Sequence, residues 1–187
     1  MRLTALLALV AFDALQLVAP RVALGDEAVI EDFESAPENR WRFVADTVMG
    51  GVSTGDVDFV SRDGDSFARM TGRVSTENNG GFIQFRTKLP DAAPEGTTGV
   101  RLWVRGNGER YFVHLRTGGT ILPWQYYQAG FETGPDWTEI RLPLAAFAPS
   151  GWILADTPAA DSLTSVGIVA FGRDHEAEIE VREVGFY

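Results

Sequence analysis

The chain has 187 residues with 26 acidic and 16 basic side chains, and its net charge of −10 at pH 7 repels the phosphate backbone of nucleic acids. It contains no basic run, and the absence of cysteine excludes disulfide bonds, thiolate metal sites and cysteine nucleophiles. Its length is sufficient for one domain with its own core.

The first 25 residues have the composition of an export signal. Arg2 precedes the apolar run LTALLALVAF, and Ala23-Leu24-Gly25 places small residues where a signal peptidase cleaves. Asp13 and Arg21 interrupt the apolar stretch, which leaves it short of the about 20 residues that a transmembrane helix needs. The sequence therefore predicts a signal peptide over residues 1–25, a mature chain without a membrane span, and a periplasmic location. An uncleaved N-terminal membrane anchor is the alternative.

Residues 26–187 are predicted to form one domain. Short segments within it alternate apolar and polar side chains, which is typical of strands with one buried face. Strands are expected at 28–33, 40–44, 56–60, 67–72, 82–88, 100–105, 110–116, 124–131, 138–142, 165–171 and 177–186. Helical periodicity is confined to about one turn within 143–149. The pattern predicts an all-β, two-sheet β-sandwich. The residues expected in its core are Val100, Leu102, Val104, Ile140 and Leu142.

Two segments, DTVMGGVSTG (46–55) and TENNGGFIQFRT (76–87), each place a Gly-Gly pair beside strand-forming residues. Adjacent glycines supply positive φ, or room for another part of the chain to approach closely. We interpret both segments as structural, each forming a turn with a bulge. The alternative is a partner site lined by Asp46, Met49, Gly50, Gly51, Ser53, Asn78, Asn79, Gly80, Gly81 and Phe82.

The order of these motifs resembles the complex I intermediate-associated protein 30 family. The resemblance runs from Trp41 to the C-terminus, and its most specific pieces are MGGVS (49–53), NNGGF (78–82) and the spacing Gly106-x-Gly108-x-x-Tyr111. It implies a jelly-roll β-sandwich of the galactose-binding-domain-like type, similar to family 11 carbohydrate-binding modules. It also implies a role as an assembly factor, which in mitochondrial members assists respiratory complex I.

No arrangement of residues indicates catalysis. The two histidines are far apart in sequence, and the acidic residues lie mostly in loops, where solvation explains them. Asp63-Gly64-Asp65 favours a turn over a Ca²⁺ site, which needs six or more oxygen ligands. We therefore expect a domain that is not an enzyme and needs neither metal nor cofactor, with an unrecognised acid pair as the weaker alternative.

Strand alternation also predicts a mixed aromatic and basic surface, provided that the strands between 100 and 142 are neighbours in one sheet. Its members would be Arg101, Trp103, Arg105, His114, Arg116, Trp124, Tyr126, Gln128 and Arg141. Aromatic rings stack on sugars or anchor protein interfaces, and Arg binds carboxylates. In the alternative interpretation, loops cover the rings and the arginines pair with glutamates across strands.

Two functions remain open on this basis. The first is a chaperone-like assembly factor that binds a polypeptide partner, such as an intermediate of a respiratory complex, through the sheet surface or the motif loops. The second is an exported module that binds a polysaccharide through the same surface. A flat apolar patch would favour a protein partner, whereas a polar cleft with Trp103, Trp124 and Tyr126 along it would favour a sugar.

Overall fold

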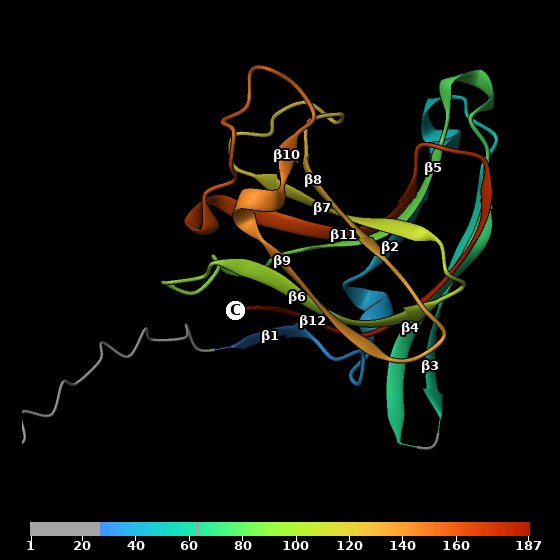
Figure 1. Cartoon of the computed structure of the whole chain (residues 1–187), viewed down its shortest axis with the longest axis horizontal. Helices are drawn as coiled ribbons and strands as arrows, with labels where there is room; N and C mark the ends of the chain where they lie inside the picture. Colours follow the sequence, from blue (N-terminus) through green and yellow to red (C-terminus); the bar gives the residue numbers. More distant parts are fainter. Residues whose placement is uncertain (1–26, 63) are drawn as a thin grey trace, which may run out of the picture.

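The computed structural model describes residues 27–62 and 64–187, which form two antiparallel sheets packed face to face (Figure 1). The expected signal peptide and Asp63 lie outside these ranges. Within them, no helix is long and apolar enough to cross a membrane.

Sheet A has the order β3-β4-β12-β6-β9, with β1 paired to β12. Its strands are β1 (Ala28–Glu31), β3 (Thr54–Arg62), β4 (Asp65–Val74), β6 (Gly99–Gly106), β9 (Thr138–Pro143) and β12 (His175–Phe186). Sheet B has the order β10-β8-β7-β11-β5-β2. Its strands are β2 (Arg42–Ala45), β5 (Phe82–Lys88), β7 (Arg110–Thr117), β8 (Tyr127–Glu132), β10 (Ala148–Pro149) and β11 (Leu163–Phe171).

The predicted sandwich and its core are confirmed. Val100, Leu102 and Val104 are almost fully buried, Leu142 is buried, and Ile140 is partly buried against the core. Helical structure in the described residues is limited to short 3-10 turns. One of them, Leu144–Ala146, lies within the segment where a single helical turn was expected.

Each of the two Gly-Gly motifs lies at a point where the chain crosses from one sheet to the other. The first leads from β2 to β3 through the 3-10 turn Asp46–Met49, and the second leads from β4 to β5 through the turn Glu77–Asn79. Both motifs meet at the fully buried carboxylate of Asp46. This carboxylate accepts hydrogen bonds from Ser53 Oγ (2.5 Å), Ser53 N (3.0 Å), Gly81 N (2.6 Å) and Phe82 N (3.2 Å).

The glycines of the motifs are needed for two different reasons. A Cβ atom on Gly51 would lie 2.3 Å from Asp46 Cγ, and one on Gly80 would lie 2.4 Å from Asp46 Oδ2. Gly50 and Gly81 instead have φ values of 93° and 124°, which other residues rarely adopt. Only glycine at positions 51 and 80 therefore leaves room for the carboxylate of Asp46.

The remaining motif residues point outward. Asn78 and Asn79 are exposed and have left-handed φ values of 57° and 59°, a conformation that Asn tolerates. Met49 is 64% exposed on the turn that follows Asp46. Within the motifs, Met49, Asn78 and Asn79 therefore face solvent, whereas Asp46 and Ser53 are buried and hydrogen-bonded between the sheets.

We expect Gly80→Ala to destabilise the fold by more than the ~1 kcal/mol of a typical point substitution, because the added Cβ displaces the Asp46 carboxylate. The free energy of unfolding in urea measures the effect. Gly134→Ala is the matched control, since a Cβ there meets no atom within 4 Å. Equal stability of the two variants would contradict the crowding at Asp46.

Candidate functional site

The structure divides the nine residues of the expected surface between the two sheets. Arg101, Trp103, Arg105 and Arg141 lie on β6 and β9 of sheet A, whereas His114, Arg116 and Gln128 lie on β7 and β8 of sheet B, with Trp124 and Tyr126 in the loop before β8. The assumption of one shared sheet was wrong. The turn after β6 carries the chain across the sandwich, so strands that are consecutive in sequence belong to opposite sheets.

On sheet A, four of the seven arginines in the described strands are paired with glutamates. Arg105 lies 2.5 Å from Glu180, and Arg69 lies 2.6 Å from Glu178. Arg101 pairs with Glu183 of β12, whereas Arg141 pairs with Glu139 of its own strand and with Glu27, which precedes β1. Trp103 is covered by the guanidinium of Arg182, 4.6 Å from its ring centre. Arg69, Arg101, Arg105 and Arg141 thus form the ladder of ion pairs that the alternative interpretation of the sequence expected.

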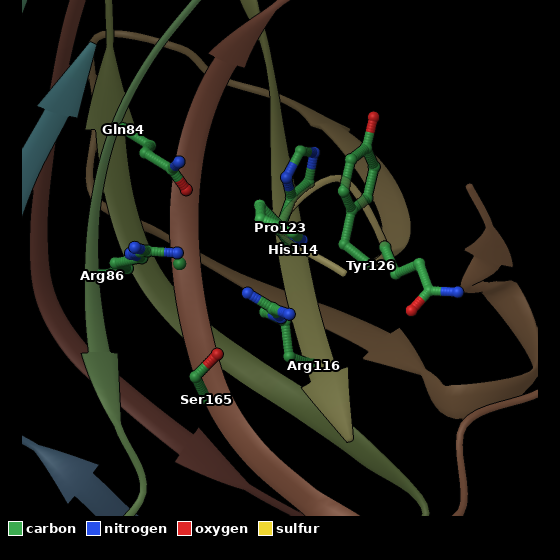
Figure 2. Close-up of a pocket in the computed structure, with 9 residues that line it drawn as sticks. Gln84, Arg86, His114, Arg116, Pro123, Tyr126 and Ser165 are labelled. Carbon is green, nitrogen blue, oxygen red and sulfur yellow. The ribbon is translucent and has the colours of Figure 1, made fainter. Parts of the chain in front are cut away.

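The outer face of sheet B has a different character, which follows from the strand register. On the central strand β11, Gly167 lies between Arg86 of β5 and His114 of β7, and Ser165 lies between Lys88 and Arg116. Small residues on the central strand and long residues on the flanking strands create a trough between β5 and β7. Figure 2 shows Gln84 and Arg86 on one side of this trough and His114 and Arg116 on the other.

Two adjoining hollows form the trough, and they share Arg86, Arg116 and Ser165. The larger one encloses about 890 Å³ and continues across β5 to β2. Its lining residues are Asn39, Arg40, Arg42, Val44, Arg86, Thr87, Lys88, Leu89, Pro90, Arg116, Thr120, Thr164 and Ser165. We call the two hollows together the sheet B groove.

In the part of the chain that the structure describes, the cations of this groove lack acidic partners of the kind that Arg69 and Arg105 have on sheet A. Within the described part of the chain, Arg42, Arg86, Lys88 and Arg116 form no ion pair; Arg40, at the edge, pairs with Glu31. Burial and the nearby charge of Arg86 lower the pKa of Arg116. The groove is therefore a cationic region on an acidic protein.

Arg116 is held in place by the loop between β7 and β8. Its Nη2 atom donates to the backbone oxygens of Thr120 (2.8 Å) and Leu122 (2.9 Å). These bonds fix the guanidinium at the wall of the groove without neutralising it. They also tie the position of the loop to the groove.

Beside Arg116, the wall is aromatic. The rings of His114 and Tyr126 are stacked with centres 4.0 Å apart and an angle of 8° between their planes. His114 Nε2 lies 2.8 Å from Gln128 Oε1 and donates to it in the neutral ring. Burial lowers the pKa of His114 to about 4, although the bond to Gln128 favours the charged form. His114 is thus a neutral, stacked part of the wall.

An apolar rim borders this wall. Ile121 and Trp124, in the loop before β8, are 83% and 66% exposed, and Trp152 and Ile153, in the loop after β10, are 93% and 67% exposed. Both loops lie at the same end of sheet B (Figure 1), and Ser150 Oγ donates to the backbone oxygen of Trp124 (3.0 Å). With Leu122, these residues form what we call the apolar rim.

Sequence reasoning missed several residues of the groove and rim. Arg42, Arg86 and Lys88 were not considered, although the alternation within 82–88 places Gln84, Arg86 and Lys88 on one face. Trp152 lies in a loop without periodicity, so no sequence signal identified it as exposed.

The architecture is a jelly-roll-like β-sandwich. It is similar to the family 11 carbohydrate-binding module of Clostridium thermocellum in complex with a β-1,3-1,4-mixed-linked tetrasaccharide, with a TM-score of 0.68 and 14% identity over 86% of this chain and 94% of that one. The family 11 module of the cellulase Lic26A-Cel5E from the same organism gives 0.68 and 13%, covering 86% and 93%. A family 30 module of another C. thermocellum cellulase gives 0.52 and 12%, covering 72% and 82%.

At these identities the likeness establishes the fold alone. Residues 31–181 match the family described as "Complex I intermediate-associated protein 30", and the chain belongs to this family. A comparison with curated proteins gives no match.

We expect the ring of His114 to titrate near pH 4, well below the ordinary value of 6.5, because protonation would place a charge in a position that is partly removed from water. Since the unfolded chain takes up the proton first, stability should be lost as the pH falls from about 6.5 towards about 4. Proton NMR of a His175→Gln variant, which keeps a single imidazole, measures the pKa. A value near 6.5 would show that the ring is solvated.

Proposed function

We propose that the protein is a non-catalytic, exported binding domain that holds a polypeptide partner in the sheet B groove, in keeping with the assembly role for which its family is named. The observation that carries the proposal is the combination of an open groove with the adjoining apolar rim. Monomeric proteins rarely expose contiguous large apolar side chains without a partner, and Trp and Arg are common anchors of protein interfaces.

The composition of the groove supports binding rather than chemistry. Among the described residues its lining contains no carboxylate and therefore no acid pair for hydrolysis, and the imidazole of His114 is kept neutral and stacked on Tyr126. Arg, Gln and Ser side chains supply hydrogen bonds that position a ligand without activating it.

A second candidate is the binding of a polysaccharide in the same groove. The similar family 11 module is described in complex with a mixed-linked tetrasaccharide, and the ring of Tyr126 at the wall is of the kind that stacks on sugars. The aromatic arrangement favours the polypeptide, however. Trp103 lies on the opposite sheet and Trp124 projects from the rim, so neither lines the groove with Tyr126.

We expect Arg116→Ala and Tyr126→Ala each to weaken partner binding by ~2 kcal/mol or more, as for truncated anchors at interfaces. The purified protein is immobilised, bound periplasmic proteins are identified by mass spectrometry, and binding to barley mixed-linked β-glucan is measured by affinity electrophoresis. A protein captured by wild type and lost in both variants supports the polypeptide. Glucan binding that is lost in both supports the second candidate.

Arg141→Ala is the matched control, because this arginine lies on sheet A in an exposed ion pair whose loss costs little. It should bind as wild type does. Equal losses in the control and the groove variants would show that the sheet B groove is not the binding surface. Thermal unfolding of all three variants separates lost binding from lost folding.

A further inference from the structure

Positive charge is balanced differently in the sheet B groove and in the ion-pair ladder of sheet A, although Arg62, Arg73 and Arg182 on sheet A strands also form no ion pair within the described residues. On sheet A, glutamates of β12 and β9 stand beside Arg69, Arg101, Arg105 and Arg141, and each of these arginines has an acidic partner. On sheet B, in the described residues, four cations of the groove have none. The chain has more acidic than basic residues, so the missing partners do not reflect a shortage of carboxylates.

The unpaired cations are also close together. Arg42 of β2 lies directly opposite Arg86 of β5, and Lys88 follows two residues later on the same face of β5. Ser165 separates Lys88 from Arg116 across β11. Like charges placed opposite one another destabilise a sheet, so a groove built in this way is relieved when it receives negative charge.

Resting on the proposed function, we infer that the partner segment held in the sheet B groove is acidic and supplies the carboxylates that the groove lacks. An Arg guanidinium binds a carboxylate through two parallel hydrogen bonds, which matches the exposed guanidinium of Arg86. The strands from β2 to β7 span roughly 14 Å at ~4.8 Å spacing, a distance that about five extended residues cover. The groove thus accommodates a short run of Glu or Asp.

The assignment to a polypeptide, rather than to an acidic polysaccharide, follows from the rim. Tyr126, at the wall of the groove, is two residues from the exposed Trp124, and Ser150 Oγ, two residues before the exposed Trp152, is hydrogen-bonded to the backbone of both Tyr126 and Trp124. A polypeptide can carry acidic side chains in one stretch and apolar side chains in the next, whereas a polyuronide repeats the same charged unit along its length. The groove and rim together therefore fit a segment with an acidic run followed by apolar residues.

The test measures fluorescence anisotropy of a fluorescein-labelled glutamate peptide of about six residues, matched to the span of the groove. We expect binding at low salt that is lost near 1 M NaCl, where the Debye length falls to ~3 Å. Arg86→Glu and Lys88→Glu should each weaken it at least about tenfold. Both residues are exposed and unpaired within the described residues, so these reversals break no ion pair seen there.

Arg62→Glu is the matched control, since it makes the same charge change on β3 of sheet A, and its binding should stay within about twofold of wild type. Equal binding of a glutamine peptide would overturn the requirement for negative charge. Binding of oligogalacturonate in preference to the glutamate peptide would overturn the assignment to a polypeptide.

Capture of the natural partner separates this inference from the function on which it rests. If the partner is lost in Tyr126→Ala, Arg86→Glu and Lys88→Glu, the proposed function and the inference of an acidic partner are both supported. If it is lost in Tyr126→Ala but kept in the two charge reversals, the groove binds a partner that is not acidic and only the inference fails. If all three variants keep the partner, the groove is not the site and both fail.

Discussion

The buried carboxylate of Asp46 is the interaction on which the placement of the two sheets depends. Burial alone raises the pKa of this group, but the hydrogen bonds from Ser53, Gly81 and Phe82 outweigh that effect and hold the pKa below its ordinary value. The stability that they provide is therefore present above the ordinary aspartate range and is lost as the pH falls through the lowered pKa. Because Phe82 begins β5, the same bonds fix the start of the strand that carries Arg86 and Lys88. Asp46 thus helps to position the groove through β5, although it does not line the groove itself.

Charge is distributed over this framework by strand pairing rather than by overall composition. On sheet A, β12 contributes alternating glutamates to strands that carry arginine, and the result is a ladder of ion pairs that is partly exposed at Arg69 and Arg105 and largely buried at Arg101. The central strand of sheet B, β11, contributes Ser165 and Gly167 instead, so the cations of its neighbours face an open trough. The glutamates of β12 therefore pair with Arg69, Arg101 and Arg105, whereas Ser165 and Gly167 of β11 offer Arg86, Lys88 and Arg116 no such partner.

Most of the fold was predictable from the sequence, because period-two alternation reports which side of a strand is buried. Val100, Leu102 and Val104 belong to the core for that reason, and the Gly-Gly pairs lie where the backbone is crowded or has positive φ. The candidate site was predicted only in part. Alternation identifies the outward side of a strand but not the sheet to which it belongs, so the residues of β6 and β7 were combined although they lie on opposite surfaces. The unpaired state of Arg86 was equally inaccessible, since it depends on which residues of β11 and β2 lie beside it.

The arrangement of sheet B gives its groove a direction. At the end formed by β2 and β5, its polar contacts are the guanidinium of Arg42 and the side chains of Arg86 and Lys88. At the end formed by β7 and β8, the groove is lined by the stacked rings of His114 and Tyr126, and the apolar rim follows. The neutral state of His114 maintains this difference, because a protonated ring would extend the positive charge to the aromatic end. Arg116 stands between the two ends and is held by the loop that carries the rim, so the charged and apolar halves keep a fixed spacing. A ligand that is uniform along its length satisfies only one half of such a groove, whereas a segment whose chemistry changes along the chain contacts both halves in a single orientation.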